Sequence, residues 1–534
     1  MGINNKRITI LFPILLACAV VLGMFLNSVF QKRTGADTGI FKLPQAGNKL
    51  DIVLNMIEKD YVDTVSAADL VEDAIPTILK DLDPHTVYIP AKDLQRVNED
   101  LKGNFGGIGV QFIRYQDTVA IVRVIPGGPS ESAGILAGDR IVQVDDSLVA
   151  GIEMSDNEIM DRLKGPKGTP VKIGIYRRGE KGIIQKELVR GSIPVASVDI
   201  AYMLSEQIGY IKVSRFAATT YFEFFEGLQK LNAKGMQKLI VDLRSNTGGY
   251  LSEATNMINE FLPKGKMIVY TQGKSQPKSD YMSTGNGQFQ ELPIIVLIDE
   301  VSASASEIFA GAIQDNDRGK IVGRRSFGKG LVQEQRMLSD GSALRLTVAR
   351  YYTPTGRCIQ KSYENGTEDY YNDLNHRYLN GEFEEQDSIH FNDSLKYITP
   401  GGNIVYGGGG IMPDVFIPAD TSGYSNYFRD LRRKGVIYQY AFSFVDKHRK
   451  EMLGLKDYQS VLAFIKNKPV IKELVAYAKN KGIPADSKGL AESRTVIETQ
   501  IKAYIARDVI DDEGFYPIIK DVDATLLEAE TLFD

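Results

Sequence analysis

Residues 293–310 read PIIVLIDEVSASASEIFA, and the fold of the chain depends on the change of pattern inside this stretch. Its first half is a continuous apolar run of strand length, and its second half has the spacing of a helix. Ser302, Ser304 and Ser306 stand at the junction. Ser304 and Glu307 have the S-x-x-E spacing of a capping box, which satisfies free backbone groups at a helix start. The same position also suits a catalytic nucleophile.

The alternation of strand and helix continues on both sides of this stretch, from about residue 196. Strand patterns occur at 208–213, 238–243, 293–299 and 320–323, and helical patterns at 219–232, 251–261 and 304–315. Such alternation predicts an α/β domain whose active site lies at the C-terminal ends of the strands. Two loops follow such ends, SNTGGY at 245–250 and VSASAS at 301–306.

Other parts of the chain have different patterns, which predict a multidomain protein. Residues 31–102 contain helical spacing at 48–82, and residues 103–195 contain short alternating strands separated by glycines. The α/β domain is expected at 196–425, with an irregular insertion at 361–409 that is rich in Asn, Asp, Glu and Tyr. Helical periodicity returns over 426–534.

Composition excludes several classes of function. The 534 residues include 63 Lys plus Arg and 68 Asp plus Glu, and the net charge of -5 gives no electrostatic reason to expect a nucleic-acid partner. Cys18 and Cys358 are too few for a disulfide framework or a cysteine metal site. The four histidines match no metal-ligand spacing, so neither a metal nor another cofactor is expected.

The N-terminal region 1–30 has the features of a membrane anchor. Residues 8–30 follow Lys6 and Arg7 and carry no charge, and they are long enough to span a bilayer as a helix. The run lacks the short apolar region and the clear cleavage site of a removed signal peptide. We therefore expect an uncleaved signal anchor, with a lipoprotein that begins at Cys18 as the alternative. The flanking charges do not fix its orientation.

A serine nucleophile needs a base, and residues 196–360 contain no histidine. A lysine that loses water contacts on burial can serve instead, because its pKa falls toward neutrality. Lys329 is the candidate: Gly328 and Gly330 allow the backbone to bend closely around it, and Gln333 stands four residues later as a hydrogen-bond partner. The alternative is an ordinary solvated loop lysine.

The same segment also allows a nucleotide-binding interpretation. Gly323, Gly328 and Lys329 have the G-x-x-x-x-G-K spacing of a P-loop. The next residue, Gly330, replaces the Ser or Thr that would bind magnesium, and residues 331–352 alternate like a hairpin. A P-loop needs a helix there, since the helix N-terminus binds the phosphate. The pattern therefore disfavours a nucleotide site.

The loop DLRSNTGG at 242–249 offers the remaining element of acyl-transfer chemistry. Its paired glycines, which include Gly248, can present backbone N–H groups to an oxyanion. The alternative is a tight strand-to-helix turn that needs positive φ. The same loop can be a tight turn and also present N–H groups to an oxyanion.

Five motifs in order resemble those of the C-terminal processing peptidases, or tail-specific proteases. They are DLRSNTGG (242–249), SASASEIFAGAIQD (302–315), GRRSFGKGLVQ (323–333), DGSALRLTVARYYTPTGR (340–357) and GIMPDV (410–415). LDPHTVY at 82–88 and the glycine-rich segments of 103–146 also resemble that family. The resemblance implies serine proteases with a serine–lysine dyad, a PDZ domain at 103–195 and a ClpP/crotonase-like α/β protease domain.

By this resemblance Ser304 is the nucleophile, Lys329 the general base and Gln333 the residue that orients the lysine. The N–H groups of Gly248 and Ala305 would form the oxyanion hole. Ser302 and Ser306 would be packing or capping residues. The resemblance also implies a bacterial host, with the chain anchored in the inner membrane and its catalytic part in the periplasm.

In PDZ domains a glycine-rich loop binds the terminal carboxylate of a peptide, and the peptide adds as a strand. Gly107, Ile108, Gly109 and Val110 have the composition for that loop, with Ile108 and Val110 as pocket residues. Substrates with free, apolar C-termini are therefore expected. The alternative is a plain hairpin in which these residues only pack the core.

Taken together, the residues predict a serine endopeptidase that cleaves protein substrates at or near their C-termini. The competing function is a non-catalytic PDZ scaffold that binds peptide tails, with a protease-like domain as support. Ser304, Lys329 and Gln333 are all present, which favours the enzyme. Assembly as a homo-oligomer or with an adaptor protein stays open.

Overall fold

A computed structural model describes residues 46–389 and 392–533. The expected anchor at 8–30 lies outside the described residues. Within them, no helix combines the length and the apolar character needed to cross a bilayer. The chain divides into two compact units between Ile75 and Pro76. The first unit contains α2 (Ala46–Asp60) and most of α3 (Ala67–Leu79), so the helical pattern expected at 48–82 is confirmed.

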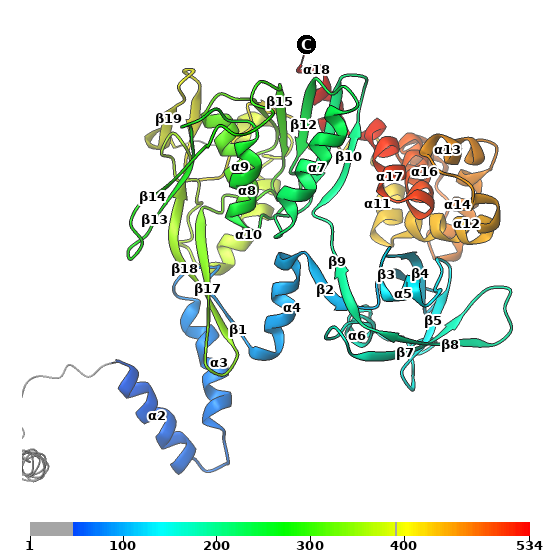
Figure 1. Cartoon of the computed structure of the whole chain (residues 1–534), viewed down its shortest axis with the longest axis horizontal. Helices are drawn as coiled ribbons and strands as arrows, with labels where there is room; N and C mark the ends of the chain where they lie inside the picture. The colour runs from blue at the N-terminus through cyan, green and yellow to red at the C-terminus, as the bar shows by residue number, and fades with distance from the viewer. Residues whose placement is uncertain (1–45, 390–391, 534) are drawn as a thin grey trace, which may run out of the picture. The chain divides into compact units, whose positions relative to one another are not determined.

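The second unit is built around a six-stranded sheet of order β10-β11-β12-β15-β16-β21 (Figure 1). Its strands are Val198–Met203, Ile208–Val213, Lys238–Asp242, Ile294–Ile298, Lys320–Gly323 and Val415–Phe416. From β11 to β21 neighbouring strands are parallel, and β10 is antiparallel to β11. Helices α7 (Thr220–Asn232), α8 (Leu251–Asn259) and α9 (Ala305–Asp315) connect the strands as the sequence predicts.

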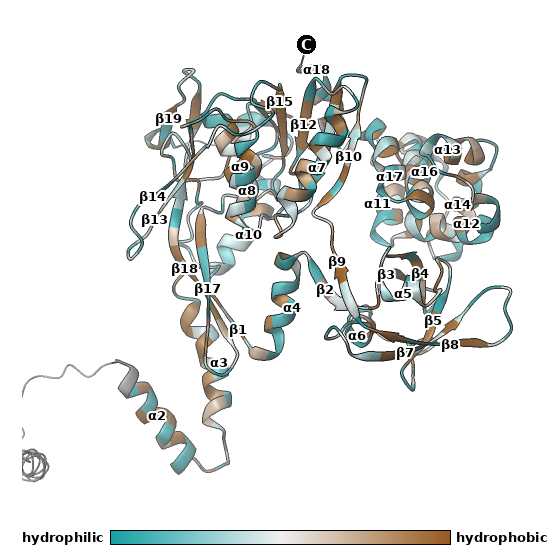
Figure 2. Cartoon of the chain, viewed as in Figure 1, coloured by the Kyte–Doolittle hydropathy of each residue, from teal (hydrophilic) through white to brown (hydrophobic). Residues whose placement is uncertain are grey.

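Both faces of this sheet are covered, which explains why its central strands are continuous apolar runs rather than alternating ones. One face packs against α7, α8 and α9, and Phe224, Met257 and Phe309 are fully buried there. The other face buries Leu526 and Ala529, near the end of the chain. Figure 2 shows β12 and β15 as hydrophobic strands in the middle of the domain.

A second sheet lies beside the first and includes a long hairpin. Strands β17 (Leu331–Met337) and β18 (Ala343–Tyr352) form this hairpin, and β18 also pairs with β1 (Val87–Ile89) and β13 (Met267–Gln272). Strand β14 (Ser279–Met282) completes the sheet. Because a strand rather than a helix follows Lys329, the phosphate-binding interpretation of 323–329 is wrong.

Residues 103–195 form the expected β domain. Its sheet has the order β3-β4-β5-β7-β8, with β6 paired to β5. These strands are Val110–Tyr115, Thr118–Val124, Arg140–Val144, Pro170–Tyr176, Ile183–Val189 and Ser147–Leu148, and β2 (Asn104–Gly107) pairs separately with β9 (Gly191–Pro194). The helices are α4 (Ala91–Lys102), just before it, α5 (Pro129–Ser132) and α6 (Asp156–Leu163).

The insertion at 361–409 is more regular than its composition indicates. It contains helix α10 (Thr367–Leu379), two short 3-10 turns (Gln386–Ser388, Asp393–Leu395) and a hairpin of β19 (Lys396–Ile398) and β20 (Ile404–Tyr406). The expectation of an irregular segment was wrong for α10. Tyr370 and Arg377 of this helix are buried, and packing by such side chains holds a helix that polar composition disguises.

The C-terminal region is helical, as expected, and contains two parts with different cores. The first is the bundle α11 (Asn426–Arg433), α12 (Val436–Met452), α13 (Tyr458–Ile465), α14 (Val470–Asn480), α15 (Ser487–Glu492), α16 (Arg494–Ile510) and α17 (Asp512–Ile519). This bundle has its own hydrophobic core. The second part, a 3-10 turn (Lys520–Val522) and α18 (Ala524–Thr531), packs on the protease sheet instead.

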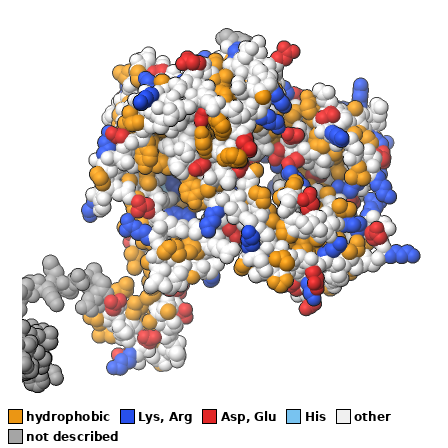
Figure 3. All heavy atoms as spheres, in the orientation of Figure 1, with side chains coloured by type: hydrophobic (Ala, Val, Ile, Leu, Met, Phe, Trp, Pro, Cys, Tyr) orange, Lys and Arg blue, Asp and Glu red, His pale blue; other side chains and the backbone are white. Residues whose placement is uncertain are grey.

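The face of the molecule seen in Figure 3 mixes basic, acidic and hydrophobic side chains. This intermixing agrees with the small net charge of -5.

Candidate active site

Ser304 occupies a special backbone position at the N-terminus of α9. Its φ of 57° and ψ of -114° lie outside the helical and extended regions, a conformation that costs a non-glycine residue energy. Ser304 is partly exposed, whereas Ser302 and Ser306 on either side are fully buried. Burial therefore separates the three serines of the opening stretch: Ser304 lines a cleft, and its neighbours do not.

Ser302 and Ser306 connect the serine loop to the neighbouring loop at 243–249. The Ser302 hydroxyl donates to the Leu243 carbonyl at 2.9 Å, and the Ser306 hydroxyl donates to the Asn246 carbonyl at 2.8 Å. Buried hydroxyls with such partners serve structure rather than chemistry. Their contacts agree with the packing role expected for them.

The Glu307 carboxylate joins the serine loop to the lysine loop. It accepts hydrogen bonds from the N–H groups of Ser304, Gly328 and Lys329 at 2.8, 2.7 and 2.9 Å, and from the Ser326 hydroxyl at 2.6 Å. Burial raises the pKa of Glu307 to about 7, although these hydrogen bonds oppose the shift. The capping box seen in the sequence is thus also a connection between the two candidate catalytic residues.

The Lys329 side chain is held by Gln333, as the sequence predicts. Its Nζ donates to Gln333 Oε1 at 3.1 Å, and Gln333 Nε2 in turn donates to the carbonyl of His85. Burial lowers the pKa of Lys329, and the positive charge of Arg345 lowers it further. Among the described side chains, Ser304 Oγ and Lys329 Nζ make no direct hydrogen bond, although both line the same cleft. Catalytic contacts often tighten only when substrate binds.

The contacts that surround His85, the hydrogen-bond partner of Gln333, were not predicted. They join the LDPHTVY segment to α10, which is more than 280 residues away in the chain. His85 Nε2 bonds the Tyr370 hydroxyl at 2.8 Å, and the Tyr371 hydroxyl donates to the Pro84 carbonyl at 2.8 Å. Burial and the charge of Lys329 lower the pKa of His85 to about 4, so its ring is neutral at pH 7. The LDPHTVY motif was the available sign that this segment matters, but the sequence does not show that its partner is α10.

Gly248 lies directly against Ser304. Its φ is +99°, and a β-carbon there would meet Ser304 Cβ at 2.7 Å and the Ala305 nitrogen at 2.9 Å. Glycine is thus required both by conformation and by space. Its N–H, however, already donates to Asn246 Oδ1 at 2.9 Å, which the expected oxyanion role did not anticipate. Within the described residues, the N–H groups of Gly249 and Ala305 have no acceptor.

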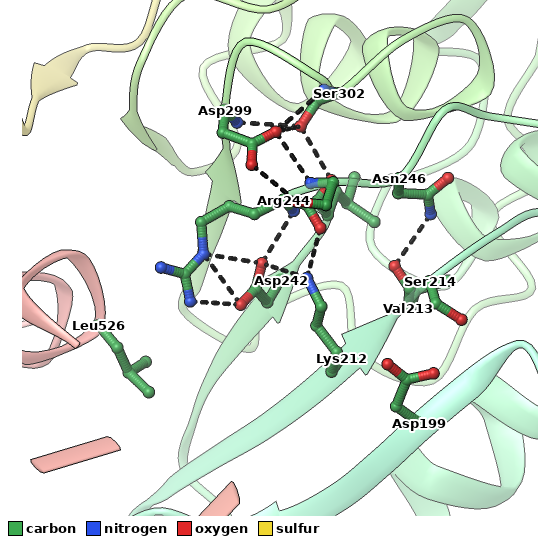
Figure 4. A network of polar contacts seen from close by, with 12 residues as sticks. Asp199, Lys212, Val213, Ser214, Asp242, Arg244, Asn246, Asp299, Ser302 and Leu526 are labelled. Atoms are coloured by element: carbon green, nitrogen blue, oxygen red, sulfur yellow. Dashed lines mark hydrogen bonds and ion pairs between the residues drawn. The ribbon is translucent and has the colours of Figure 1, made fainter. Parts of the chain in front are cut away.

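A charged network supports the loop that carries Gly248 (Figure 4). Asp242, at the end of β12, is buried between Arg244 and Lys212, which it contacts at 2.6 and 3.1 Å. Burial alone would raise the pKa of Asp242, but the two cations and the Tyr210 hydroxyl lower it well below its usual range. The carboxylate therefore stays charged in the core.

The network also includes a residue from the C-terminal segment. Asp523 accepts two hydrogen bonds from Arg244, at 2.8 Å from Nη1 and 2.7 Å from Nη2. Its side chain also accepts from Leu526 N at the start of α18. The end of the chain thus contacts the base of the glycine loop, although 279 residues separate Asp523 from Arg244.

The cleft that contains Ser304 and Lys329 has a volume of about 680 Å³. It lies at the C-terminal ends of β12 and β15, which confirms the position expected from strand and helix order. Apolar side chains that line it include Leu251, Ile308 and Leu331.

The glycine-rich loop of the β domain differs in part from the expectation. Ile108 is 2% exposed and belongs to the domain core, so it does not line a pocket. Gly107 belongs to β2, and Gly109 has a φ of +79°. Val110 begins β3 and lines a cavity of about 1040 Å³, together with Met160 of α6 and residues 507–511.

Comparison with family models assigns three parts of the chain. A model described as peptidase family S41 matches residues 207–370, and a PDZ domain model matches residues 106–185. A family of unknown function matches residues 427–511. The S41 match includes Ser304, Lys329 and Gln333.

Curated relatives extend this similarity. The chain is 37% identical over 313 residues to a carboxy-terminal-processing protease of Bartonella bacilliformis, covering 58% of this chain and 71% of the relative. It is 34% identical over 362 residues to the carboxy-terminal processing protease CtpA of Bacillus subtilis, covering 67% and 76%. Among solved structures, a photosystem II D1 C-terminal processing protease is 29% identical, with a TM-score of 0.33 over 58% of this chain and 88% of that one.

Proposed function

Since this chain belongs to the carboxy-terminal processing protease family, within the S41 peptidases, we propose that Ser304 and Lys329 are its catalytic dyad. The protein is a serine-type endopeptidase that cleaves protein substrates near their C-termini. The observation that supports the dyad most directly is the cleft itself. Ser304, unlike Ser302 and Ser306, is partly exposed and lines this cleft, and the half-buried Lys329, whose pKa is lowered by burial, lines it too.

In the proposed reaction, neutral Lys329 Nζ takes the proton of the Ser304 hydroxyl as Oγ attacks the peptide carbonyl. The resulting ammonium gives this proton to the departing amine, and an acyl-enzyme remains. Lysine then activates a water molecule, which hydrolyses the ester. Gln333 positions the amine, since its Oε1 accepts from Nζ at 3.1 Å.

The oxyanion formed in this reaction needs N–H donors close to Ser304. Ala305 N–H is free of other acceptors in the described chain, and the absence of a side chain at Gly248 lets the glycine backbone lie directly against Ser304 and Ala305. We assign the second donor to the 248–249 glycine pair. Gly248 N–H can contribute only if its bond to Asn246 opens, whereas Gly249 N–H needs no such change.

The PDZ domain supports recognition of peptide tails. In the described chain β3 pairs on one side only, with β4, so its outer edge can accept a peptide strand. Gly109, with its positive φ, and the preceding Gly107 would present N–H groups to the terminal carboxylate. Val110 and Met160 line the adjacent cavity and would contact the last apolar side chain.

Activity measurements on single variants test the dyad. Ser304→Ala and Lys329→Ala should each reduce kcat by a factor of about 10⁴ or more against a denatured protein substrate, because the two residues act as a unit. Lys329→Arg should also be inactive, since a guanidinium stays protonated. Ser339→Ala and Lys274→Ala, at exposed positions, are the matched controls. Normal turnover by Ser304→Ala would exclude Ser304 as the nucleophile.

The pH dependence provides a second test of the lysine. Activity should rise with pH through an apparent pKa well below that of a free lysine, because only the neutral amine accepts a proton. The competing scaffold function predicts peptide binding by the PDZ domain with no Ser304-dependent cleavage at any pH.

We retain the membrane anchor at 8–30, and with it the periplasmic location, as part of the proposal. Its support is the uncharged run of membrane-spanning length. Fractionation and N-terminal sequencing of the full chain should find the intact N-terminus in the inner membrane. A mature chain that begins at Cys18 would support the lipoprotein alternative.

A further inference from the structure

The charge of the active-site cleft is one-sided. Three basic side chains, Lys102, Lys329 and Arg345, line it, and no Asp or Glu is among the described residues of its wall. A cleft lined by charges of one sign concentrates groups of the opposite sign. The part of the substrate that binds here is therefore expected to carry negative charge.

Arg345 is the basic residue best suited to bind that charge. Lys329 is assigned to proton transfer, and Lys102 is exposed. The Arg345 guanidinium is half-buried and donates through Nη2 to Gln335 Oε1 at 3.0 Å, while no acidic side chain of the described chain pairs with it. Arginine has five N–H donors in a planar fork that matches a carboxylate. Most of these donors remain available for a ligand.

The strand register gives the position of Arg345 relative to Gln333, which holds Lys329. Across the β17–β18 hairpin, Gln333 pairs with Thr347 and Gln335 pairs with Arg345. Gln333 and Gln335 are two residues apart on one strand, so their side chains point to the same face, about 7 Å apart. Arg345 thus lies opposite Gln335, two residue pairs further along the hairpin than Gln333, the residue that holds Lys329. An extended substrate covers the same distance in about two residues.

We propose that Arg345 is a specificity-determining residue that binds a substrate carboxylate about two residues from the scissile bond. This inference rests on the proposed function of the cleft. The carboxylate has two sources, an acidic side chain or the free C-terminus of a short tail. Both present the same planar anion to the guanidinium.

A peptide series measures the effect and separates the sources. In the first set, each peptide has one cleavage site and an amidated C-terminus. A single Asp, or Asn as its neutral counterpart, is placed in turn at each of the three positions on either side of that site. A second set would end one, two or three residues past the cleavage site, as the acid or the amide. In the wild-type enzyme kcat/KM should be about tenfold higher for the charged member at one position, because a charge-assisted contact is gained.

Two substitutions at Arg345 test its part in that preference. Arg345→Gln should bring the ratio of kcat/KM between the charged and neutral members close to one. Arg345→Glu should invert the preference, so that a Lys peptide is cut faster than the Asp peptide. Arg336→Gln is the matched control: Arg336 lies on the same hairpin, is 61% exposed and is absent from the cleft wall, so its ratio should equal that of wild type.

Peptide binding to the Ser304→Ala variant, measured without turnover, makes the test independent of catalysis. The ratio of Kd values for the charged and neutral peptides should change with Arg345→Gln in this background, even if the dyad assignment is wrong. Because Arg345 lies outside the PDZ domain, tail binding there does not depend on it. An unchanged ratio in both the kinetic and the binding series, or an equal change in Arg336→Gln, would overturn the proposal.

Discussion

Glu307, in the first turn of α9, and Asp242, at the end of β12, are both buried carboxylates beside the loops that build the active site, and they differ in the groups that they contact. Glu307 accepts hydrogen bonds from neutral donors, three backbone N–H groups and a hydroxyl, and its pKa rises to about 7. Asp242 contacts Arg244 and Lys212, and its pKa falls. Burial favours the neutral acid in both cases, so a cationic partner decides which carboxylate stays charged.

The largest expected effect comes from the charged network. Asp242→Asn leaves the partly buried Arg244 and Lys212 without their central, fully buried carboxylate, and removing one partner of a buried ion pair costs about 3–5 kcal/mol. We expect this loss in the free energy of unfolding measured with urea, together with loss of activity. A loss below about 1 kcal/mol would mean that Asp523 alone compensates both cations, and the contrast with Glu307 would then fail.

Glu307 should instead make stability depend on pH. Because its folded pKa of about 7 lies above the ordinary 4.5, the folded chain holds this proton more tightly, and stability falls as pH rises from about 4.5 to 7. The shift corresponds to about 3 kcal/mol over that window. Glu307→Gln cannot ionise, so the difference in unfolding free energy between wild type and variant should shrink as pH rises. Exposed Glu206→Gln is the control, and it should follow wild type throughout.

Asp523→Asn tests how far the C-terminal segment supports the glycine loop. Arg244 would keep Asp242 and lose one charge-assisted pair, at a cost of about 1–2 kcal/mol. We expect kcat to fall severalfold with little change in KM, because the loop beside Ser304 is less well held. Asp523→Glu should recover part of kcat. Equal kcat in wild type and Asp523→Asn would limit this residue to stabilising the fold.

The smallest effect is expected for Ser306→Ala. This change removes one hydrogen bond to the Asn246 carbonyl, which still accepts from Ala303 N, and should cost about 1 kcal/mol. The kcat/KM should stay within about threefold of wild type. A variant that folds normally but does not cleave would show that Ser306 has a chemical role, contrary to its burial.

The sequence was informative where chemistry depends on residues close together in the chain. Lys329 and Gln333 are four residues apart, and their side chains are hydrogen-bonded as predicted. The glycine-rich PDZ loop was informative in part: Val110 lines a cavity, but Ile108, in the loop between β2 and β3, is in the core, because loop composition does not say which side chain points inward.

Contacts between distant segments could not be predicted. Tyr370 lies in an insertion whose polar composition concealed a helix, and it bonds His85 across 285 residues. Asp523 meets Arg244 across 279 residues, in a region that periodicity describes only as helical. Without the paired segment, a lone aspartate or tyrosine gives no local signal of its partner.

By itself, the sequence determined the order of β11, β12, β15 and β16 with the helices between them, and the loops at the strand ends, because both follow from local periodicity and turn residues. It also supplied a serine, a lysine and a glutamine at the spacing of a known family. The tertiary structure decided which of three serines faces the cleft, which buried carboxylate keeps its charge, and that no acidic side chain of the described chain pairs with Arg345. Burial and long-range pairing set these properties, and both exist only once distant segments have packed together.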